Sequence, residues 1–220
     1  MKAYHFIFFF CFLIYSCNKK DCSVRNKPNI LFILVDDLGI KDLGYTGSKF
    51  YETPNIDALA KKGFVFTQGY ANSRVCSPSR ASILTGQYGQ VNGVVDLSGR
   101  LAKENQYLPI EMGKLGYETA MIGKWHLKNK PSGFDHWLVL PGQGRYDNPI
   151  LRDSLTWDEG GKEYKGFSSD VIAAESINWL KNRNNNDDPF LLFTHFKSTH
   201  EPFRYPARYE NFLQDEELPY

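Results

Sequence analysis

Three apolar runs along the chain mark the strands that the sequence predicts. Near-continuous apolar stretches that end in polar residues occupy 28–37, 118–127 and 188–203. Runs of this kind are typical of strands buried on both faces, as in a parallel sheet. A shorter strand is predicted at 65–71.

The segments between these runs space their apolar residues as helices do. The clearest is 168–183, where Val171, Ala174, Ile177 and Leu180 would form one apolar face. Further helices are predicted at 53–63, 77–86 and 107–117. Because strands and helices alternate, we expect an α/β fold with a mainly parallel sheet flanked by helices.

The stretch 130–167 is rich in Gly, Pro and Asp, and it predicts a long loop region at the rim of the sheet. The sequence contains no internal repeat and no low-complexity segment.

The first residues have the pattern of an export signal. Residues 1–16 contain a basic start and an apolar run that is too short to span a bilayer. "LIYSC" at 13–17 resembles a bacterial lipobox and predicts lipidation of Cys17; an ordinary signal peptide cut nearby is the alternative. Residues 17–27 would form a tether, and 28–220 the folded part. We therefore expect a bacterial cell-envelope protein, periplasmic or at the surface, that meets the membrane only through a lipid anchor.

Charge and cysteine content narrow the function classes. With 26 basic and 25 acidic residues, the composition does not indicate binding to nucleic acid. Three of the four cysteines, Cys11, Cys17 and Cys22, precede the predicted fold, so a disulfide framework is not expected. Cys76 is then either a buried structural thiol or a chemically special one.

Polar residues follow each of the long predicted strands. Asp36 and Asp37 follow the first, Lys124 and His126 the second, and His200 the third. Sites in α/β sheets collect at the carboxyl ends of the strands, so these residues predict one shared site.

The individual residues leave simpler interpretations open. Cys76 at a helix start, with Arg80 about one turn on, would be an activated thiol or a buried cysteine beside a surface arginine. Asp36 and Asp37 would bind Ca²⁺ or Mg²⁺, or form a solvated acidic turn. Lys124 and His126 would face a common substrate, or be a surface lysine and a loop histidine.

The full motif favours the functional interpretation. Cys76-Ser77-Pro78-Ser79-Arg80, followed by Leu84-Thr85-Gly86, closely resembles the signature of the sulfatase family. "NILFILVDDLG" at 29–39 resembles that family's metal-binding strand, and "GKWHL" at 123–127 resembles another segment of its site. The resemblance implies that a maturation enzyme oxidises Cys76 to formylglycine, whose hydrated aldehyde provides the nucleophile.

The resemblance also implies a role for each remaining residue. Asp36, Asp37 and residue 76 would hold a divalent metal, usually Ca²⁺ with Mg²⁺ possible. Arg80 would orient the formylglycine, and Lys124 would contact both it and the sulfate.

Two histidines would move protons. His126 would hold and help to deprotonate the second hydroxyl of the formylglycine hydrate. His200, in a segment similar to the family's P-H-x-P but with Thr199 before it, would bind sulfate or protonate the leaving group. His195 is expected to be a core histidine, and Lys197 is given no role.

The resemblance implies an alkaline-phosphatase-like fold of which this chain is the N-terminal part, with an incomplete sheet. The implied reaction is hydrolysis of a sulfate ester on a small molecule or a sulfated glycan, such as a polysaccharide. Two alternatives remain: a phosphate or phosphonate ester hydrolase of the same superfamily, and a catalytically incomplete lipoprotein fragment that binds glycans.

Overall fold

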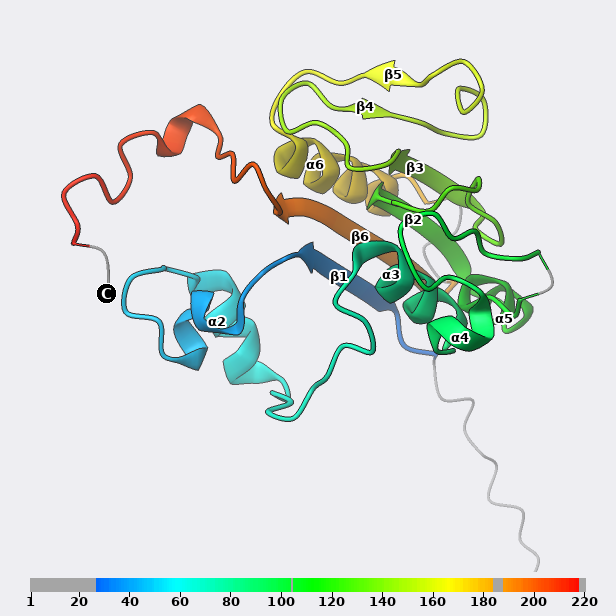
Figure 1. Cartoon of the computed structure of the whole chain (residues 1–220), viewed down its shortest axis with the longest axis horizontal. Helices are drawn as coiled ribbons and strands as arrows, with labels where there is room; N and C mark the ends of the chain where they lie inside the picture. The colour runs from blue at the N-terminus through cyan, green and yellow to red at the C-terminus, as the bar shows by residue number, and fades with distance from the viewer. Residues whose placement is uncertain (1–26, 104, 184–187, 218–220) are drawn as a thin grey trace, which may run out of the picture.

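The computed structural model describes residues 27–103, 105–183 and 188–217, so the predicted signal peptide and lipid site lie outside the described residues. A four-stranded sheet of order β1-β6-β2-β3 forms the centre, and all its strands are parallel (Figure 1). Its strands are β1 (Ile30–Asp36), β2 (Glu118–Lys124), β3 (His136–Leu140) and β6 (Phe190–Thr199). A small antiparallel pair joins β4 (Ile150–Leu151) and β5 (Lys162–Glu163).

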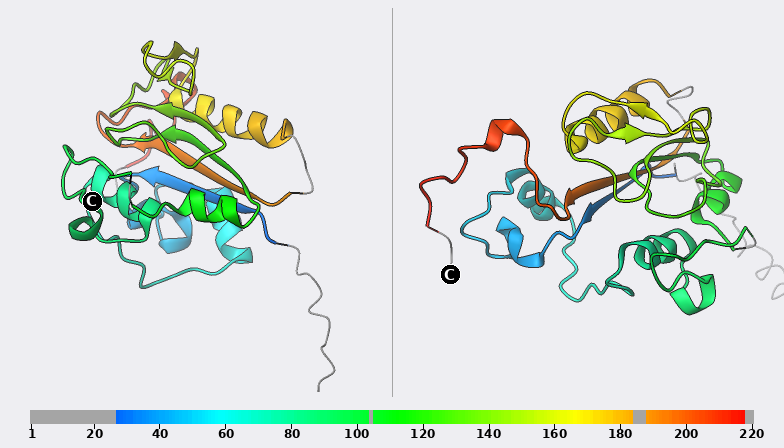
Figure 2. Two further views of the ribbon diagram at one scale, coloured as in Figure 1. Left: turned by 90° about the vertical axis from the view of Figure 1, so that its right-hand side faces the viewer. Right: turned by 45° about the horizontal axis from the view of Figure 1, so that its top comes forward.

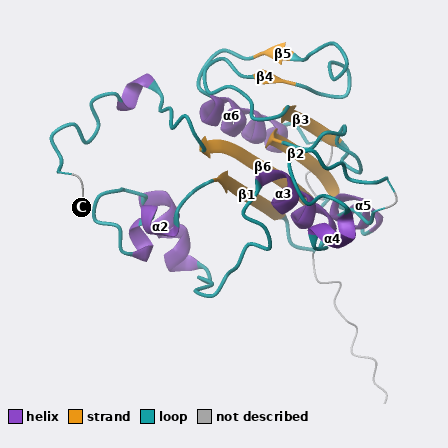
Figure 3. Cartoon of the chain, viewed as in Figure 1, coloured by secondary structure: helices purple, strands orange, loops and turns teal. Residues whose placement is uncertain are grey.

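Helices lie on both faces of the sheet, as Figures 2 and 3 show. The helix α6 (Ser168–Lys181) packs on one face, and α3 (Cys76–Thr85) and α5 (Leu108–Lys114) lie on the other. The remaining helical elements are α2 (Pro54–Lys62), α4 (Gly89–Asn92), η1 (Ile40–Asp42), η2 (Gly44–Thr46) and η3 (Ala207–Tyr209). None of the helices in the described ranges is long and apolar enough to cross a membrane. The predicted class, α/β with a parallel sheet flanked by helices, is confirmed.

Side chains along the central strands point alternately to the two faces of the sheet, and the core therefore consists of two clusters, one on each face. On β2, Ala120 and Ile122 pack with Ile172 of α6, while Met121 points to the opposite face and packs with Ala81 of α3. Because successive side chains on a strand point to opposite faces, a strand covered on both sides is apolar throughout. The prediction of a doubly buried strand is confirmed for β2.

The same prediction is wrong for one face of β1. Leu31 and Ile33 are 49% and 52% exposed, although Phe32 between them packs against the cluster below α3. Leu31 and Ile33 stay exposed because β1 lies at the edge of the sheet, whereas α6 packs over β6 and β2. This face of β1 is therefore only partly covered by the described residues.

Three further predictions need correction. Residues 65–71 form no strand but an irregular connection between α2 and α3. The stretch 130–167 contains β3, β4 and β5 and is not one long loop, because "HWLVL" gains its strand partner from β2. On α6 the buried face contains Val171, Ile172 and Trp179, whereas Ala174 and Ile177 are exposed.

Candidate active site

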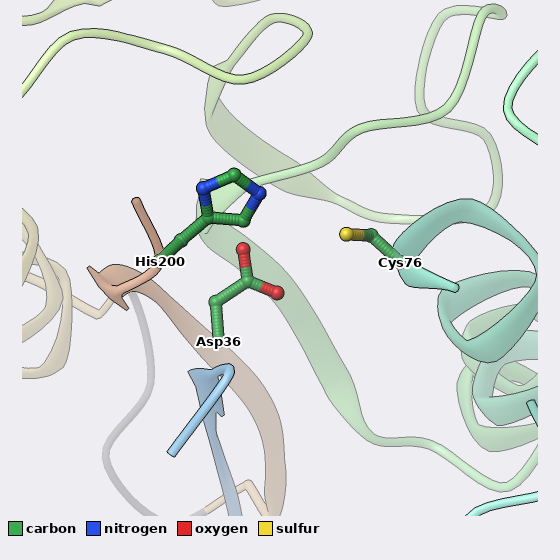
Figure 4. A group of neighbouring side chains, drawn as sticks. All are labelled: Asp36, Cys76 and His200. Atoms are coloured by element: carbon green, nitrogen blue, oxygen red, sulfur yellow. The ribbon is translucent and has the colours of Figure 1, made fainter. Parts of the chain in front are cut away.

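The carboxyl ends of β1 and β6 meet the first turn of α3 at one edge of the sheet. Figure 4 shows Asp36, Cys76 and His200 pointing toward a common space from these three elements. One ligand atom from each residue lies within 4.8 Å of the others. The structure thus brings together side chains that are far apart in the sequence.

Arg80 is the central polar contact of this edge. Its side chain is 2% exposed, and its Nη2 donates to Asp36 Oδ1 at 3.0 Å. Its Nη1 donates to the Lys124 carbonyl at 2.6 Å and lies 3.0 Å from His195 Nδ1. The same His195 nitrogen lies 3.3 Å from the Lys124 carbonyl. Arg80 therefore connects α3 to the ends of β1 and β2 and to the middle of β6.

Lys124 completes a buried charged cluster. Its ammonium is fully buried, donates to Asp36 Oδ2, and donates to Gln143 Oε1 at 2.7 Å. Burial alone would raise the pKa of Asp36, but the charges and hydrogen bonds of Arg80 and Lys124 outweigh it and lower that pKa. With two cations for one carboxylate, this cluster is net positive and favours an anion.

His126 is positioned by the start of α3. Ser77 Oγ donates to the His126 carbonyl at 2.6 Å, and the backbone of His126 is left-handed, with φ of 51°. Its Nδ1 is buried and has no hydrogen-bond partner among the described residues. Burial, assisted by Lys124 and Arg80, lowers the pKa of His126 to about 4. At neutral pH the imidazole is neutral and able to accept a proton.

His200 has one ring nitrogen held and one directed at Asp37. Its Nδ1 lies 2.7 Å from the Glu201 carbonyl, which can only accept, so this nitrogen carries the hydrogen. Its Nε2 lies 3.8 Å from Asp37 Oδ2. The Tyr146 hydroxyl donates to the His200 carbonyl and fixes this backbone.

The donors present fit a hard divalent cation in type. Asp36 is buried at the end of β1, and Asp37, in a left-handed turn with φ of 58°, presents a half-exposed carboxylate next to it. Ca²⁺ takes about six to eight oxygen ligands, so these two carboxylates and an oxygen at position 76 would supply part of its coordination. The observation that supports this fit is that Asp36, Asp37 and Cys76 line one cavity, although both oxygens of Asp36 also accept from Arg80 and Lys124.

Sequence reasoning assigned His195 to the core and missed two other residues. His195 is 2% exposed as expected, but it also contacts Arg80. Gln143, which contacts Lys124, and Tyr146, which contacts His200, follow the carboxyl end of β3. Their position after a strand is the available signal, and the prediction of a loop region over 130–167 does not use it.

Two of the cavities at this edge are lined by residues of the site. One of about 260 Å³ is lined by Asp36, Asp37, Cys76 and Arg80, among others. A second of about 450 Å³ is lined by the loop after β3 and the segment after β6. His200 lines the second cavity and also belongs to the cluster with Cys76, so it lies where the reacting centre and the second cavity adjoin.

Comparison with known proteins finds a family match and similar proteins. The family model described as Sulfatase matches residues 28–217. N-acetylglucosamine-6-O-sulfatase of Bacteroides thetaiotaomicron is 38% identical over 189 residues, covering 84% of this chain and 33% of that protein. Human N-acetylgalactosamine-6-sulfatase is 33% identical over 212 residues, covering 80% of this chain and 40% of its own length.

A solved structure has a similar fold. It is a protein in complex with its substrate D-glucosamine-2-N,6-O-disulfate, with a TM-score of 0.82 and 35% identity; the match covers 88% of this chain and 39% of that chain. The chain thus spans between a third and two fifths of the length of these relatives.

Proposed function

Because the chain belongs to the sulfatase family, we propose that the protein hydrolyses sulfate esters at the site formed by Asp36, Cys76 and His200. The observation that carries this proposal is the convergence of these three side chains beside a net-positive pair, Arg80 and Lys124. A sulfate ester is an anion, and preorganised cations stabilise the charge that develops on its oxygens.

Cys76 is proposed to be a precursor. A maturation enzyme with an external oxidant would convert its thiol to the aldehyde of formylglycine, which provides the nucleophile when hydrated. The position at the start of α3 supports this role, because free backbone N–H groups there favour an anionic oxygen.

The surrounding residues would neutralise charge, orient residue 76 and transfer protons. Lys124 neutralises charge on the sulfuryl oxygens, and Arg80 holds Asp36 and orients residue 76. His126, which its lowered pKa of about 4 keeps neutral at neutral pH, would accept the proton from the second hydroxyl of residue 76. His200, whose Nδ1 donates to the Glu201 carbonyl, would donate a proton from Nε2 to the departing alcohol in the form that carries hydrogen on both ring nitrogens.

Asp36, Asp37 and residue 76 would hold the metal, with Ca²⁺ favoured and Mg²⁺ as the alternative. When bound, such a cation acts as a Lewis acid toward sulfuryl oxygens. The oxygen donors of the two aspartates support this assignment.

The substrate is proposed to be a sulfated amino sugar within a glycan. The support comes from the relatives, whose names specify 6-sulfated N-acetylglucosamine and N-acetylgalactosamine. The apolar start and "LIYSC" of the sequence support export and lipidation at Cys17, which would place the enzyme where extracellular glycans are met.

Two measurements test the function. The protein is produced in a host with the maturation enzyme, and its hydrolysis of an aryl sulfate is compared with that of the matched aryl phosphate. Preference for sulfate is expected, with loss of activity in Cys76→Ala. Preference for phosphate by a wide margin would identify a phosphoesterase of the same fold.

Mass spectrometry of the peptide containing residue 76 provides the second measurement. The expected mass corresponds to replacement of the thiol by an aldehyde. An unmodified thiol, together with no hydrolysis of either ester, would contradict catalysis and favour a protein that only binds glycans.

A further inference from the structure

Lys197 on β6 is a buried cation that the proposed chemistry does not use. The residue is 3% exposed, yet it lines the 450 Å³ cavity together with His200, Tyr146 and Gln143. Its ammonium lies 4.5 Å from the centre of the Tyr146 ring. Because the Tyr146 hydroxyl also holds the His200 backbone, one aromatic ring positions both Lys197 and His200.

No carboxylate pairs with this ammonium in the described part of the chain. The two arginines that line the same cavity differ: Arg145 is paired with Glu163 at 2.8 Å, and Arg204 with Asp147 at 2.9 Å. Burial, and then the charge of Lys124, lower the pKa of Lys197. Burying an unpaired ammonium is unfavourable, and only part of the cost is offset by an aromatic face.

The charge of the cavity favours an anion. Arg145 and Arg204 line it with carboxylate partners of their own, so Lys197 is the lining cation whose charge no carboxylate pairs with among the described residues. Lys197 lines the larger cavity with His200 and does not line the smaller cavity with Cys76 and Arg80, so its side chain lies on the His200 side of the site. His200 is the proposed proton donor to the leaving alcohol, so this is the side of the leaving sugar.

We infer that Lys197 binds a second anionic group on the sugar whose sulfate ester is cleaved, and thereby selects doubly charged substrates. This inference rests on the proposed sulfatase function and specifies its substrate class. A hydrogen bond from a charged donor to an anion has a larger effect than one between neutral groups, so Lys197 would discriminate between substrates that differ only in this charge.

The test uses two sugars that share a 6-O-sulfate: D-glucosamine-2-N,6-O-disulfate and N-acetylglucosamine-6-O-sulfate. The wild type is expected to have the higher kcat/KM for the disulfate. Lys197→Met should lower the ratio of kcat/KM for the disulfate to kcat/KM for the monosulfate about tenfold, mainly by raising the KM for the disulfate. Lys197→Arg should retain most of the wild-type ratio.

Lys162→Met is the matched control. Lys162 also lies over an aromatic ring, 5.8 Å from the centre of Tyr164, but it does not line the cavity. This variant should keep the wild-type ratio. An unchanged ratio in Lys197→Met, or an equal fall for both sugars, would overturn the inference while leaving the sulfatase function intact.

Binding to the Cys76→Ala protein makes the test independent of turnover. By calorimetry the disulfate should bind about tenfold more tightly than the monosulfate, and Lys197→Met added to this background should remove the difference. A difference that persists without Lys197, or no difference when it is present, would contradict the inference. Failure of the sulfatase function would instead appear as no hydrolysis of either sugar by the wild type.

Discussion

At the scale of single residues, Arg80 shows why the motif needs arginine. Its guanidinium contacts Asp36, the Lys124 carbonyl and His195, which belong to β1, β2 and β6. A planar group with several fixed donors can make these contacts together, whereas an ammonium on a flexible stem cannot. Arg80 therefore stabilises the edge of the sheet on which the site is built.

Arg80→Lys should lower the free energy of unfolding by about 3 kcal/mol, because buried partners lose their donors. Chemical denaturation measures this change. Arg208→Lys is the matched control, since Arg208 pairs with Asp170 at an exposed position, and its unfolding midpoint should not move. Equal effects of the two substitutions would contradict the role given to Arg80.

At the scale of elements, the close approach of β2 and β6 depends on Gly123. This residue pairs with His195, precedes Lys124, and has a φ of 105°. A Cβ added there would lie 2.0 Å from the His195 carbonyl oxygen. Only glycine permits this backbone contact, which places Lys124 at the strand end.

Gly123→Ala should therefore destabilise the fold by roughly 3 kcal/mol or more, because a backbone atom cannot move away as a flexible side chain could. Thermal unfolding measures the effect. Gly113→Ala in α5 is the control: its Cβ would meet nothing within 4 Å, so the substitution should be neutral or slightly stabilising. A stable Gly123→Ala protein would show that the strands can separate at little cost.

At the scale of the whole molecule, the parallel sheet holds two core clusters and a charged edge that includes buried neutral histidines. Burial lowers the pKa of His195 well below its usual value, and that of His126 to about 4. In an unfolded chain both would titrate at about 6.5. Between about pH 4 and about pH 6.5 the unfolded chain therefore binds more protons than the folded chain. The free energy of unfolding rises with pH across this range.

We expect full stability above about pH 6.5 and a progressive loss toward about pH 4, to which His126 alone contributes about 3 kcal/mol. Asp36 does not contribute in this window, because its pKa is lowered and its effect lies at more acidic pH. Urea unfolding at a series of pH values measures the slope. His126→Gln should flatten it and Lys162→Met should not; an unchanged slope in His126→Gln would contradict the assignment.

Several features could be predicted from local patterns in the sequence. Apolar runs predicted β1, β2 and β6, and a start at Ser77 and Pro78 with a stop at Gly86 predicted α3. The family resemblance is confirmed by the match over residues 28–217. Local pattern was insufficient for β3, which depends on pairing with β2, and for the buried face of α6, where the Thr194 hydroxyl donates to Ser176 and Trp179 packs on Phe190.

The sequence by itself determined the class of fold and the types of reactive side chain, because periodicity and motif are local properties of the chain. Only the tertiary structure decided that Asp36 accepts from both Arg80 and Lys124, and that Lys197 is buried without a carboxylate partner among the described residues. These contacts join residues between 44 and 88 positions apart for Asp36. Pairing over such separations is set by how strands and helices pack together, which no local pattern records.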